Sequence, residues 1–454
     1  MTKRSIICDM VSGFKASSPA VNQQSQMDGL TVYLNGQSDG SSFLGKLPSV
    51  VLVNIFRFVD NKNELLRLAS VCRSWRDLIY TTPTLWRNMH LKLCCKCKCL
   101  NRKKAFSTAK RFGCHLCELS ISVCKHHKCY PNCCYLATVF RKYLQDLRHP
   151  TLTSIKINDI ELRFASTRTM SSISREMTRL VSRLDRLQCF KMTKAQWPKE
   201  EGNNLLNTVL TTSRGTLQSL DIDGFFEEKP LAEKPVKLDQ LTTGILSLTR
   251  LTKLGIDYIL LTDDFVTSLS RSHAGQLQKL KLVATGIADE FIQKITSNCW
   301  VKLIKACPAL QVAFYVDPEI FENNTLDLMD PVLPICKIKF FEEDRNTDMT
   351  GVLIHIAINF RQSLVMLSGD LNHRSEKIDA TFLNLVRKCQ YLRYVNVSGY
   401  FLKPETAKTA MKLIGDRKRR YDLRMLQGPP TKRAKTGPAN GPHSNMANLA
   451  TTRT

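Results

Sequence analysis

The strongest constraint on the fold is a short apolar pattern that returns about every 30 residues along much of the chain. Each copy has one apolar residue, two variable residues, a second apolar residue, one variable residue and a third apolar residue. First positions run from Leu152 to Leu392, which is 240 residues in eight steps. A period of this length predicts a solenoid, whose stacked units share one continuous core. The nine copies are Leu152/Ile155/Ile157, Leu187/Phe190/Met192, Leu217/Leu220/Ile222, Leu251/Leu254/Ile256, Leu277/Leu280/Leu282, Leu310/Ala313/Tyr315, Ile335/Ile338/Phe340, Leu364/Leu367/Gly369 and Leu392/Val395/Val397.

Each triplet predicts a short strand, and helices are predicted between triplets, for example at residues 263–270, 288–307 and 380–389. Asp263 is the predicted N-cap of the first of these helices. The pattern resembles irregular leucine-rich repeats, which implies an α/β fold with a curved sheet and helices outside it. The chain departs from such repeats at the Asn expected three residues after the triplet: it occurs at Asn372, whereas Phe225 holds the place in another copy. The alternative is a non-repeating α/β domain.

A second pattern precedes the repeats, between Leu47 and Trp86. Its apolar spacing predicts three short helices, with Pro48 in the first turn of the first helix. About 40 residues make a core too small to be stable alone, so such a unit usually needs a neighbour.

This stretch closely resembles an F-box, and the alternative is an ordinary helical subdomain. The resemblance implies that the helices bind a Skp-type adaptor, which links to a cullin-RING ubiquitin ligase. It rests on Leu47, Pro48, Val51, Leu52, Ile55, Phe56, Leu65, Leu66, Val71, Cys72, Trp75, Leu78, Leu85 and Trp86. The predicted adaptor-binding residues are Leu47, Pro48, Val51, Leu52, Ile55, Phe56, Leu65, Leu66, Val71, Cys72 and Trp75.

Ten of the 17 cysteines lie between Cys94 and Cys134. Two Cys-x-x-Cys pairs, Cys94/Cys97 and Cys114/Cys117, have the spacing of a four-thiolate zinc site. A redox-responsive thiol patch and an iron–sulfur site remain alternatives. A second site is predicted from Cys124, His126, Cys129 and Cys133.

The net charge of +26 is concentrated in two places. Residues 92–134 carry ten Lys and Arg against one acid, and residues 416–454 carry nine against two. The rest of the chain is only mildly basic, which makes a nucleic-acid coat over the whole surface an unfavoured interpretation. Asp221 and Asp223, which flank Ile222, are predicted to be solvated.

Two features bear on location. No stretch has the roughly 20 apolar residues of a membrane helix, and the first residues do not form a signal peptide. We therefore predict a protein of the nucleus, the cytoplasm or both. Two basic clusters in the tail resemble a bipartite nuclear import signal, and they consist of Arg419, Arg420, Lys432, Arg433 and Lys435.

Motifs of catalysis are not found in the sequence: it has no Gly-x-Gly-x-x-Gly, no Walker-type loop and no Gly-x-Ser-x-Gly. Lone histidines such as His273 and His355 are predicted to have packing or surface roles. We predict a non-catalytic protein.

The predicted organisation is a disordered segment at 1–42, the F-box at 43–90, a cysteine-rich insert at 91–140, the solenoid at 141–415 and a disordered basic tail at 416–454. The resemblance implies a substrate receptor of a Skp–cullin–F-box ubiquitin ligase, with a protein substrate on the solenoid. Two alternatives are a zinc-dependent nucleic-acid or chromatin-binding protein, with its contact through the basic insert, and a Skp-bound scaffold outside any ligase.

Overall fold

The computed structural model describes residues 47–59, 61–93, 102–123, 134–147, 151–160, 162, 165–227, 238–284, 293–316, 325–341, 349–370, 376–398 and 404–415. The segments predicted to be disordered, 1–42 and 416–454, lie outside these residues. Two compact units meet between Ile55 and Phe56, and the second contains every element after the first helix. None of the helices in the described ranges combines the length and apolar character that crossing a bilayer requires.

Three short helices form the region predicted to be an F-box: α2 (Ser49–Arg57), α3 (Lys62–Leu68) and α4 (Arg73–Thr81). The carbonyl of Pro48 accepts hydrogen bonds from the first turn of α2. The side chain of Asn61 caps α3 by accepting from the N–H of Asn63. Cys72 caps α4, because its Sγ accepts from the N–H of Trp75. A 3₁₀ helix, Pro83–Trp86, follows.

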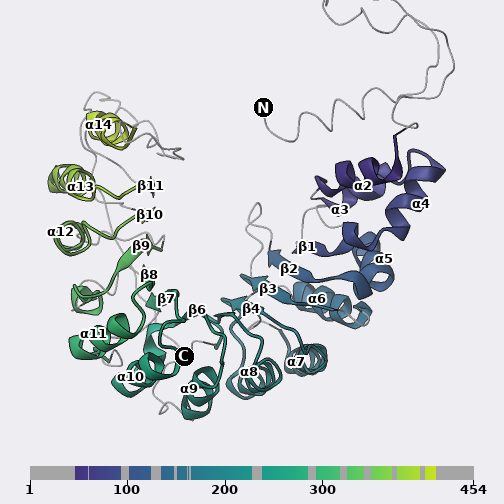
Figure 1. The fold of residues 1–454 in the computed structure, drawn as a ribbon, viewed down its shortest axis with the longest axis horizontal. Coiled ribbons are helices and arrows are strands. Elements are labelled where there is room, and N and C mark those ends of the chain that lie inside the picture. Colours follow the sequence, from purple (N-terminus) through teal and green to yellow (C-terminus); the bar gives the residue numbers. More distant parts are fainter. Residues whose placement is uncertain are drawn as a thin grey trace, which may run out of the picture. The chain divides into compact units, whose positions relative to one another are not determined.

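The rest of the described chain alternates strands with helices. Its eleven strands form one parallel sheet and lie side by side in chain order (Figure 1). This order arises because each helix returns the chain to the same edge of the sheet. The strands are β1 (Asn88–Leu93), β2 (Glu118–Val123), β3 (Ser154–Asn158), β4 (Cys189–Thr193), β5 (Ser219–Asp221), β6 (Lys253–Asp257), β7 (Lys279–Ala284), β8 (Gln311–Val316), β9 (Ile335–Phe340), β10 (Met366–Asp370) and β11 (Tyr394–Ser398).

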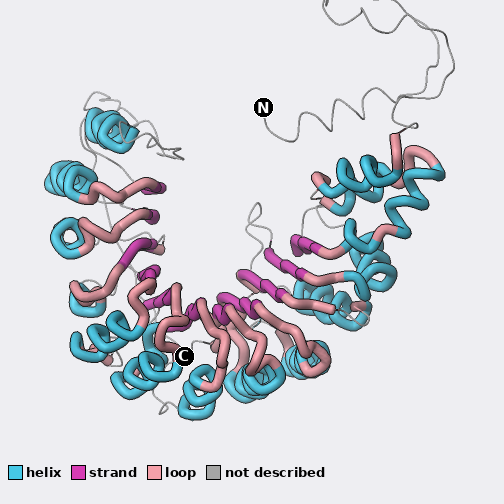
Figure 2. The backbone as a smooth tube through the Cα atoms, viewed as in Figure 1, coloured by secondary structure: helices cyan, strands magenta, loops and turns pink. Residues whose placement is uncertain are grey.

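The helices of this unit lie on one side of the row of strands (Figure 2). Successive helices also contact each other, so each repeat shares its core with its neighbours. The helices are α5 (Arg102–Phe112), α6 (Cys134–Asp146), α7 (Thr167–Val181), α8 (Lys199–Thr212), α9 (Leu238–Leu246), α10 (Asp263–Ser272), α11 (Ser297–Ala306), α12 (Thr350–Asn359), α13 (Glu376–Lys388) and α14 (Pro404–Gly415).

The strand register divides the side chains into a buried row and a polar row, because alternate residues point to opposite faces. The buried row confirms the predicted apolar triplets except the one in β8. Its members at one level of the sheet are Leu119, Ile155, Phe190, Leu220, Leu254, Leu280 and Val312.

The sheet begins earlier than the nine predicted copies, at Asn88. Strands β1 and β2 and helices α5 and α6 all overlap residues 91–140, so the described part of the predicted insert belongs to the repeat array. The same pattern is present there, as Trp86/Met89/Leu91 and Leu116/Leu119/Ile121, and all six side chains are buried. The pattern is hard to recognise in the sequence here, because Trp86 also matches the F-box pattern and the second copy lies among the clustered cysteines.

One predicted triplet is wrong by one residue. In β8 the buried side chains are Val312 and Phe314, whereas Ala313 and Tyr315 lie on the opposite face. The pairing of Leu280 with Val312 sets this register. A one-residue shift exchanges the two faces of a strand, so it brings Tyr315 to the polar face.

Two helix boundaries also differ from the prediction. Thr262, not Asp263, caps α10, because its Oγ1 accepts from the N–H of Phe265 at 3.1 Å. Asp263 instead accepts from the N–H of Thr296 in the next repeat, at 2.9 Å. Helix α11 begins at Ser297, and the described residues just before it are not helical.

An aromatic pair occupies one place where repeats of this kind have Asn. Phe225 is buried and stacks on Trp197 of the preceding repeat at 6.0 Å between ring centroids. Asn372, the one copy with the expected residue, lies outside the described residues. At Phe225, an apolar ring therefore replaces the Asn side chain, while the turn keeps a backbone hydrogen bond from the N–H of Phe225 to the carbonyl of Ile222.

Candidate interaction surfaces

The residues predicted to bind an adaptor fall into two groups once burial is known. Phe56 and Trp75 contact each other edge to face at 5.1 Å between ring centroids, so these two belong to the protein's own core. Leu52, Phe56, Leu65 and Trp75 are buried, Leu47, Ile55 and Leu66 are half-buried, and Pro48, Val51, Val71 and Cys72 are exposed.

Further apolar side chains near these residues are exposed although they were not predicted as binding residues. Val50 in α2 and Phe58 just after it have most of their surface in solvent. Val51 and Val71 are each 41% exposed. Exposed aliphatic and aromatic side chains gathered in a short segment are typical of a protein interface. The exposed side chains and the core side chains have the same apolar character in the sequence. Only their burial in the structure distinguishes the two groups.

A second candidate surface is the polar row of the sheet, which we call the polar face. Four of eight successive positions at one level are lysines and one is an acid. In strand order from β2 to β9 these positions are Ser120, Lys156, Lys191, Asp221, Gly255, Lys281, Ala313 and Lys337.

An ion cluster lies at the centre of the polar face. Lys281 Nζ donates to Asp221 Oδ1 at 3.2 Å and also to the carboxylate of Asp223. Lys191 pairs with Asp221 from the other side at 3.0 Å. Gly255 lies on β6, between Asp221 on β5 and Lys281 on β7. It leaves room for the contact between these two side chains, because a Cβ at position 255 would meet the Asp221 carboxylate. The prediction that both aspartates are solvated is therefore wrong.

The cluster shifts the titration of its members. Burial, the hydrogen bond with Asp221 and its charge raise the pKa of Asp223 to about 7, against the attraction of Lys281. Burial alone would raise the pKa of Asp221, but the hydrogen bond from Asp223 and the charges of Lys281 and Lys191 outweigh it and lower the pKa. Burial disfavours the charged form of Lys281, yet the two carboxylates outweigh it and raise the pKa of this amine.

Aromatic rings lie beside the cluster on the same face. Tyr315 in β8 and Phe341 after β9 contact each other at 6.3 Å between centroids. The ammonium group of Lys337 lies 5.1 Å from the centroid of Tyr315, and that of Lys194 lies 4.4 Å from the centroid of Phe341. Lys194 follows β4, so this contact joins repeats that are far apart along the chain.

The two histidines singled out in the sequence have packing roles. His273 is fully buried, and its Nε2 donates to the carbonyl of Leu248 at 2.9 Å. Burial lowers the pKa of His273, and this hydrogen bond only partly opposes the shift. His355 makes the same kind of bond to the carbonyl of Met329 at 3.0 Å. Both hold neighbouring repeats together.

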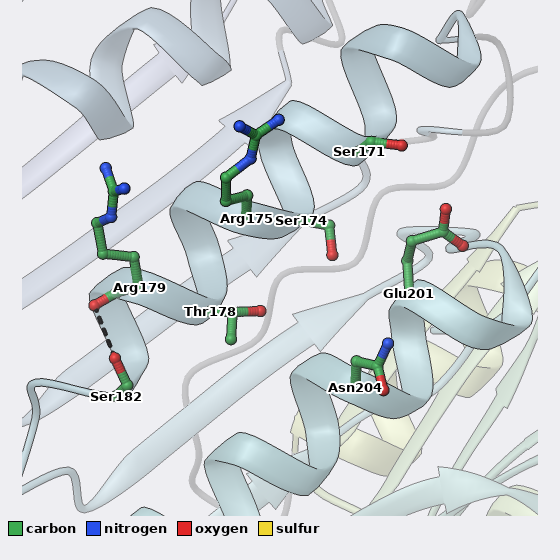
Figure 3. A pocket seen from close by; sticks show the side chains of 8 residues that line it. All are labelled: Ser171, Ser174, Arg175, Thr178, Arg179, Ser182, Glu201 and Asn204. Carbon is green, nitrogen blue, oxygen red and sulfur yellow. Dashed lines mark hydrogen bonds between the residues drawn. The ribbon is translucent and has the colours of Figure 1, made fainter.

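A shallow polar groove of about 540 Å³ lies between α7 and α8 (Figure 3). Ser171 and Thr178 of α7 line one side, and Glu201 and Asn204 of α8 line the other. Within the described ranges, none of its hydroxyls is hydrogen-bonded to a histidine or a carboxylate that could activate it. The groove therefore lacks the paired nucleophile and base of a hydrolytic site.

The predicted four-thiolate zinc set falls partly outside the described residues. Cys94 and Cys97 lie outside them, whereas Cys114 is exposed and Cys117 is half-buried directly before β2. The set therefore stays a prediction.

Other predicted sites are not described by the structure. The second metal set, Cys124, His126, Cys129 and Cys133, lies outside the described residues. The import signal formed by Arg419, Arg420, Lys432, Arg433 and Lys435 also lies outside them. Both stay predictions. In the described part of the chain, no group of three or more Cys, His, Asp and Glu side chains has the arrangement of a metal site.

Comparison with known proteins gives one family match and two distant structural likenesses. Residues 44–92 match the model of the F-box-like family. The leucine-rich repeat-containing protein LegL7 of Legionella pneumophila is 9% identical with a TM-score of 0.34, over 72% of this chain and 98% of LegL7. The yeast Rad7–Elc1 complex contains a chain that is 16% identical with a TM-score of 0.39, over 82% of each chain. Both structural likenesses are too distant to bear on function.

Proposed function

We propose that this chain is the substrate-binding subunit of a Skp–cullin–F-box ubiquitin ligase. The F-box-like domain binds a Skp-type adaptor, and the repeat sheet binds the protein that is to be ubiquitinated. The observation that carries the proposal is the set of exposed apolar side chains in the F-box-like region, led by Val51 and Val71.

The exposure of these valines is meaningful because the same region buries its other large apolar side chains. Phe56 and Trp75 are buried and contact each other edge to face, and Leu52 is buried as well, so these side chains, unlike Val51 and Val71, are already covered by the protein itself. Aliphatic side chains left in solvent beside a filled core are best explained by a partner that covers them.

Such a receptor performs no bond chemistry itself. It holds a substrate lysine close to the conjugating enzyme, and the rate gain comes from proximity and orientation.

Charge placed on the exposed valines should weaken adaptor binding. We expect Val51→Glu and Val71→Glu each to weaken recovery of the Skp adaptor and cullin from cell extract on the order of 10-fold, since a buried carboxylate at an interface centre is costly. Val332, in the loop before β9, is also 41% exposed, so Val332→Glu is a matched control that should bind normally.

Equal recovery with all three variants would contradict the proposal, provided that thermal unfolding shows them folded. Recovery of the adaptor without cullin would favour the scaffold alternative.

Zinc binding is a separate proposal, with one ion held by Cys94, Cys97, Cys114 and Cys117 and a second ion held by Cys124, His126, Cys129 and Cys133. Thiolate and imidazole ligands of this kind suit tetrahedral zinc.

Metal analysis of the full-length protein tests this assignment. We expect about one or two zinc ions per chain and a loss of zinc in Cys94→Ser and in Cys117→Ser. Cys336→Ser, outside the cysteine cluster, is the matched control and should keep its zinc. Absence of zinc in the purified protein, or equal loss in the control, would show that the assignment is wrong.

A further inference from the structure

The polar face has more positive charge than its own carboxylates neutralise. Asp221 and Asp223 are already paired with Lys191 and Lys281. No ion pair joins Lys156, Lys194 or Lys337 to a carboxylate of the described ranges. A surface of this kind attracts an anionic partner.

The rings of Tyr315 and Phe341 indicate which kind of anionic partner the polar face can bind. Two ammonium groups lie over Tyr315, from Lys281 and Lys337, and two lie over Phe341, from Lys194 and Lys339. Bases of single-stranded nucleic acid bind proteins by stacking on free aromatic faces. Rings already occupied by ammonium groups offer little surface for stacking, but these amines still have donors for carboxylates.

The size of the face sets the length of the partner. Along the sheet, six strand spacings of about 4.8 Å separate β3 from β9, so the path between them is at most about 29 Å. The distance across the face is shorter, because Lys194 after β4 reaches the ring of Phe341 after β9. An extended peptide of about nine residues is therefore long enough to reach from β3 to β9. A short acidic peptide can therefore reach every lysine of the row.

We infer that the polar face from β3 to β9 binds an acidic, carboxylate-rich segment of a partner protein, with Lys156, Lys194 and Lys337 as its main cationic contacts. This inference rests on the proposed receptor function, because it names the class of substrate segment that such a receptor takes. Lys156 and Lys337 lie on strands of the sheet, whereas Lys194 directly follows β4 and lies beside the ring of Phe341.

The test uses the full-length chain and a fluorescent peptide of about nine residues that alternates Glu with Ser. We expect saturable binding that weakens as salt rises, and no binding of the matching Gln–Ser peptide. The triple variant Lys156→Glu, Lys194→Glu, Lys337→Glu should bind the acidic peptide on the order of 10-fold or more weakly.

A second triple variant controls for net charge. Lys199, Lys302 and Lys408 are exposed on α8, α11 and α14, so their change to Glu alters net charge equally but leaves the polar face intact. This variant should bind the peptide within about twofold of the wild type. Equal weakening in both triples, or no preference for Glu over Gln, would overturn the inference.

Single-stranded and duplex oligonucleotides of mixed sequence form the last arm. Displacement of the acidic peptide by an oligonucleotide at lower concentration than unlabelled peptide would overturn the inference in favour of nucleic acid. Recovery of the Skp adaptor is measured on the same variants. Adaptor binding without peptide binding would reject the inference alone, and peptide binding without adaptor binding would reject the proposed function alone.

Discussion

The substitution Lys281→Met should lower the free energy of unfolding by about 3–5 kcal/mol at pH 8, because it leaves two buried carboxylates without their shared cation. The side chains of Asp221 and Asp223 are only 15% and 5% exposed, so water cannot replace the lost ammonium group. Lys191 still contacts Asp221, but Asp223 has no second ion pair within the described ranges. Thermal and urea unfolding at several pH values measure the effect.

The pH dependence separates lost charge from lost packing. A carboxyl whose pKa is higher in the folded state stabilises the fold at low pH and loses this contribution as the pH rises through that value. The pKa of Asp223 is already raised to about 7, and removal of Lys281 raises it further. The difference between variant and wild type should therefore shrink as the pH falls from 8 towards 4.

Lys337→Met is the matched control for this prediction. Lys337 is half-buried on the same face, but within the described ranges it forms no ion pair. Its replacement should change the free energy of unfolding by less than about 1 kcal/mol at every pH. A Lys281→Met variant as stable as the wild type at pH 8, or a loss that is the same at pH 4, would contradict the ion-cluster account.

The repeat architecture follows from the sequence because the buried row needs an apolar side chain at every second strand position. Leu220, Leu254 and Leu280 lie side by side in the sheet, and each belongs to a predicted triplet. The apolar pattern is less informative where it fits two strand registers that differ by one residue. In β8 the run from Leu310 to Val316 satisfies both registers, and only its pairing with β7 selects Val312 and Phe314.

The ion cluster is not visible in the sequence, because its members are far apart in the chain. Lys281 and Asp221 are 60 residues apart, and their contact depends on Gly255 in the strand between them. The apolar pattern of the sequence gives no sign of this role of Gly255, because a glycine has no side chain that contributes to the pattern. Composition has the same limit: it suggests a mildly basic repeat region, whereas the register gathers lysines on one face.

The substitution Trp86→Ala should have an effect of similar size, a loss of about 3–5 kcal/mol in the free energy of unfolding. Trp86 is fully buried, stacks on Phe112 at 3.7 Å between ring centroids, and donates from Nε1 to the carbonyl of Ile79 at 2.8 Å. Alanine removes the stacking and leaves a cavity that the surrounding helices fill only in part. Thermal unfolding of the full-length chain measures the loss.

Trp86→Phe separates the two contributions. It keeps an aromatic ring beside Phe112 and removes the hydrogen bond, so we expect a loss of about 1–2 kcal/mol. Unchanged thermal unfolding in Trp86→Ala would contradict the packing described here.

The position of Trp86 makes this prediction more than a test of core packing. Trp86 lies within the F-box-like match at residues 44–92, whereas Phe112 lies beyond it, at the end of α5. Trp86 is also the first residue of the earliest repeat triplet, which continues into β1 with Met89 and Leu91. The stack of Trp86 on Phe112 therefore joins the end of the F-box-like match to α5 of the first repeat, although neither ring belongs to the continuous apolar core of the repeats. Because of this contact and the hydrogen bond to Ile79, Trp86→Ala should loosen α4 and α5 together, so that adaptor binding and the packing of the first repeat fail over the same temperature range.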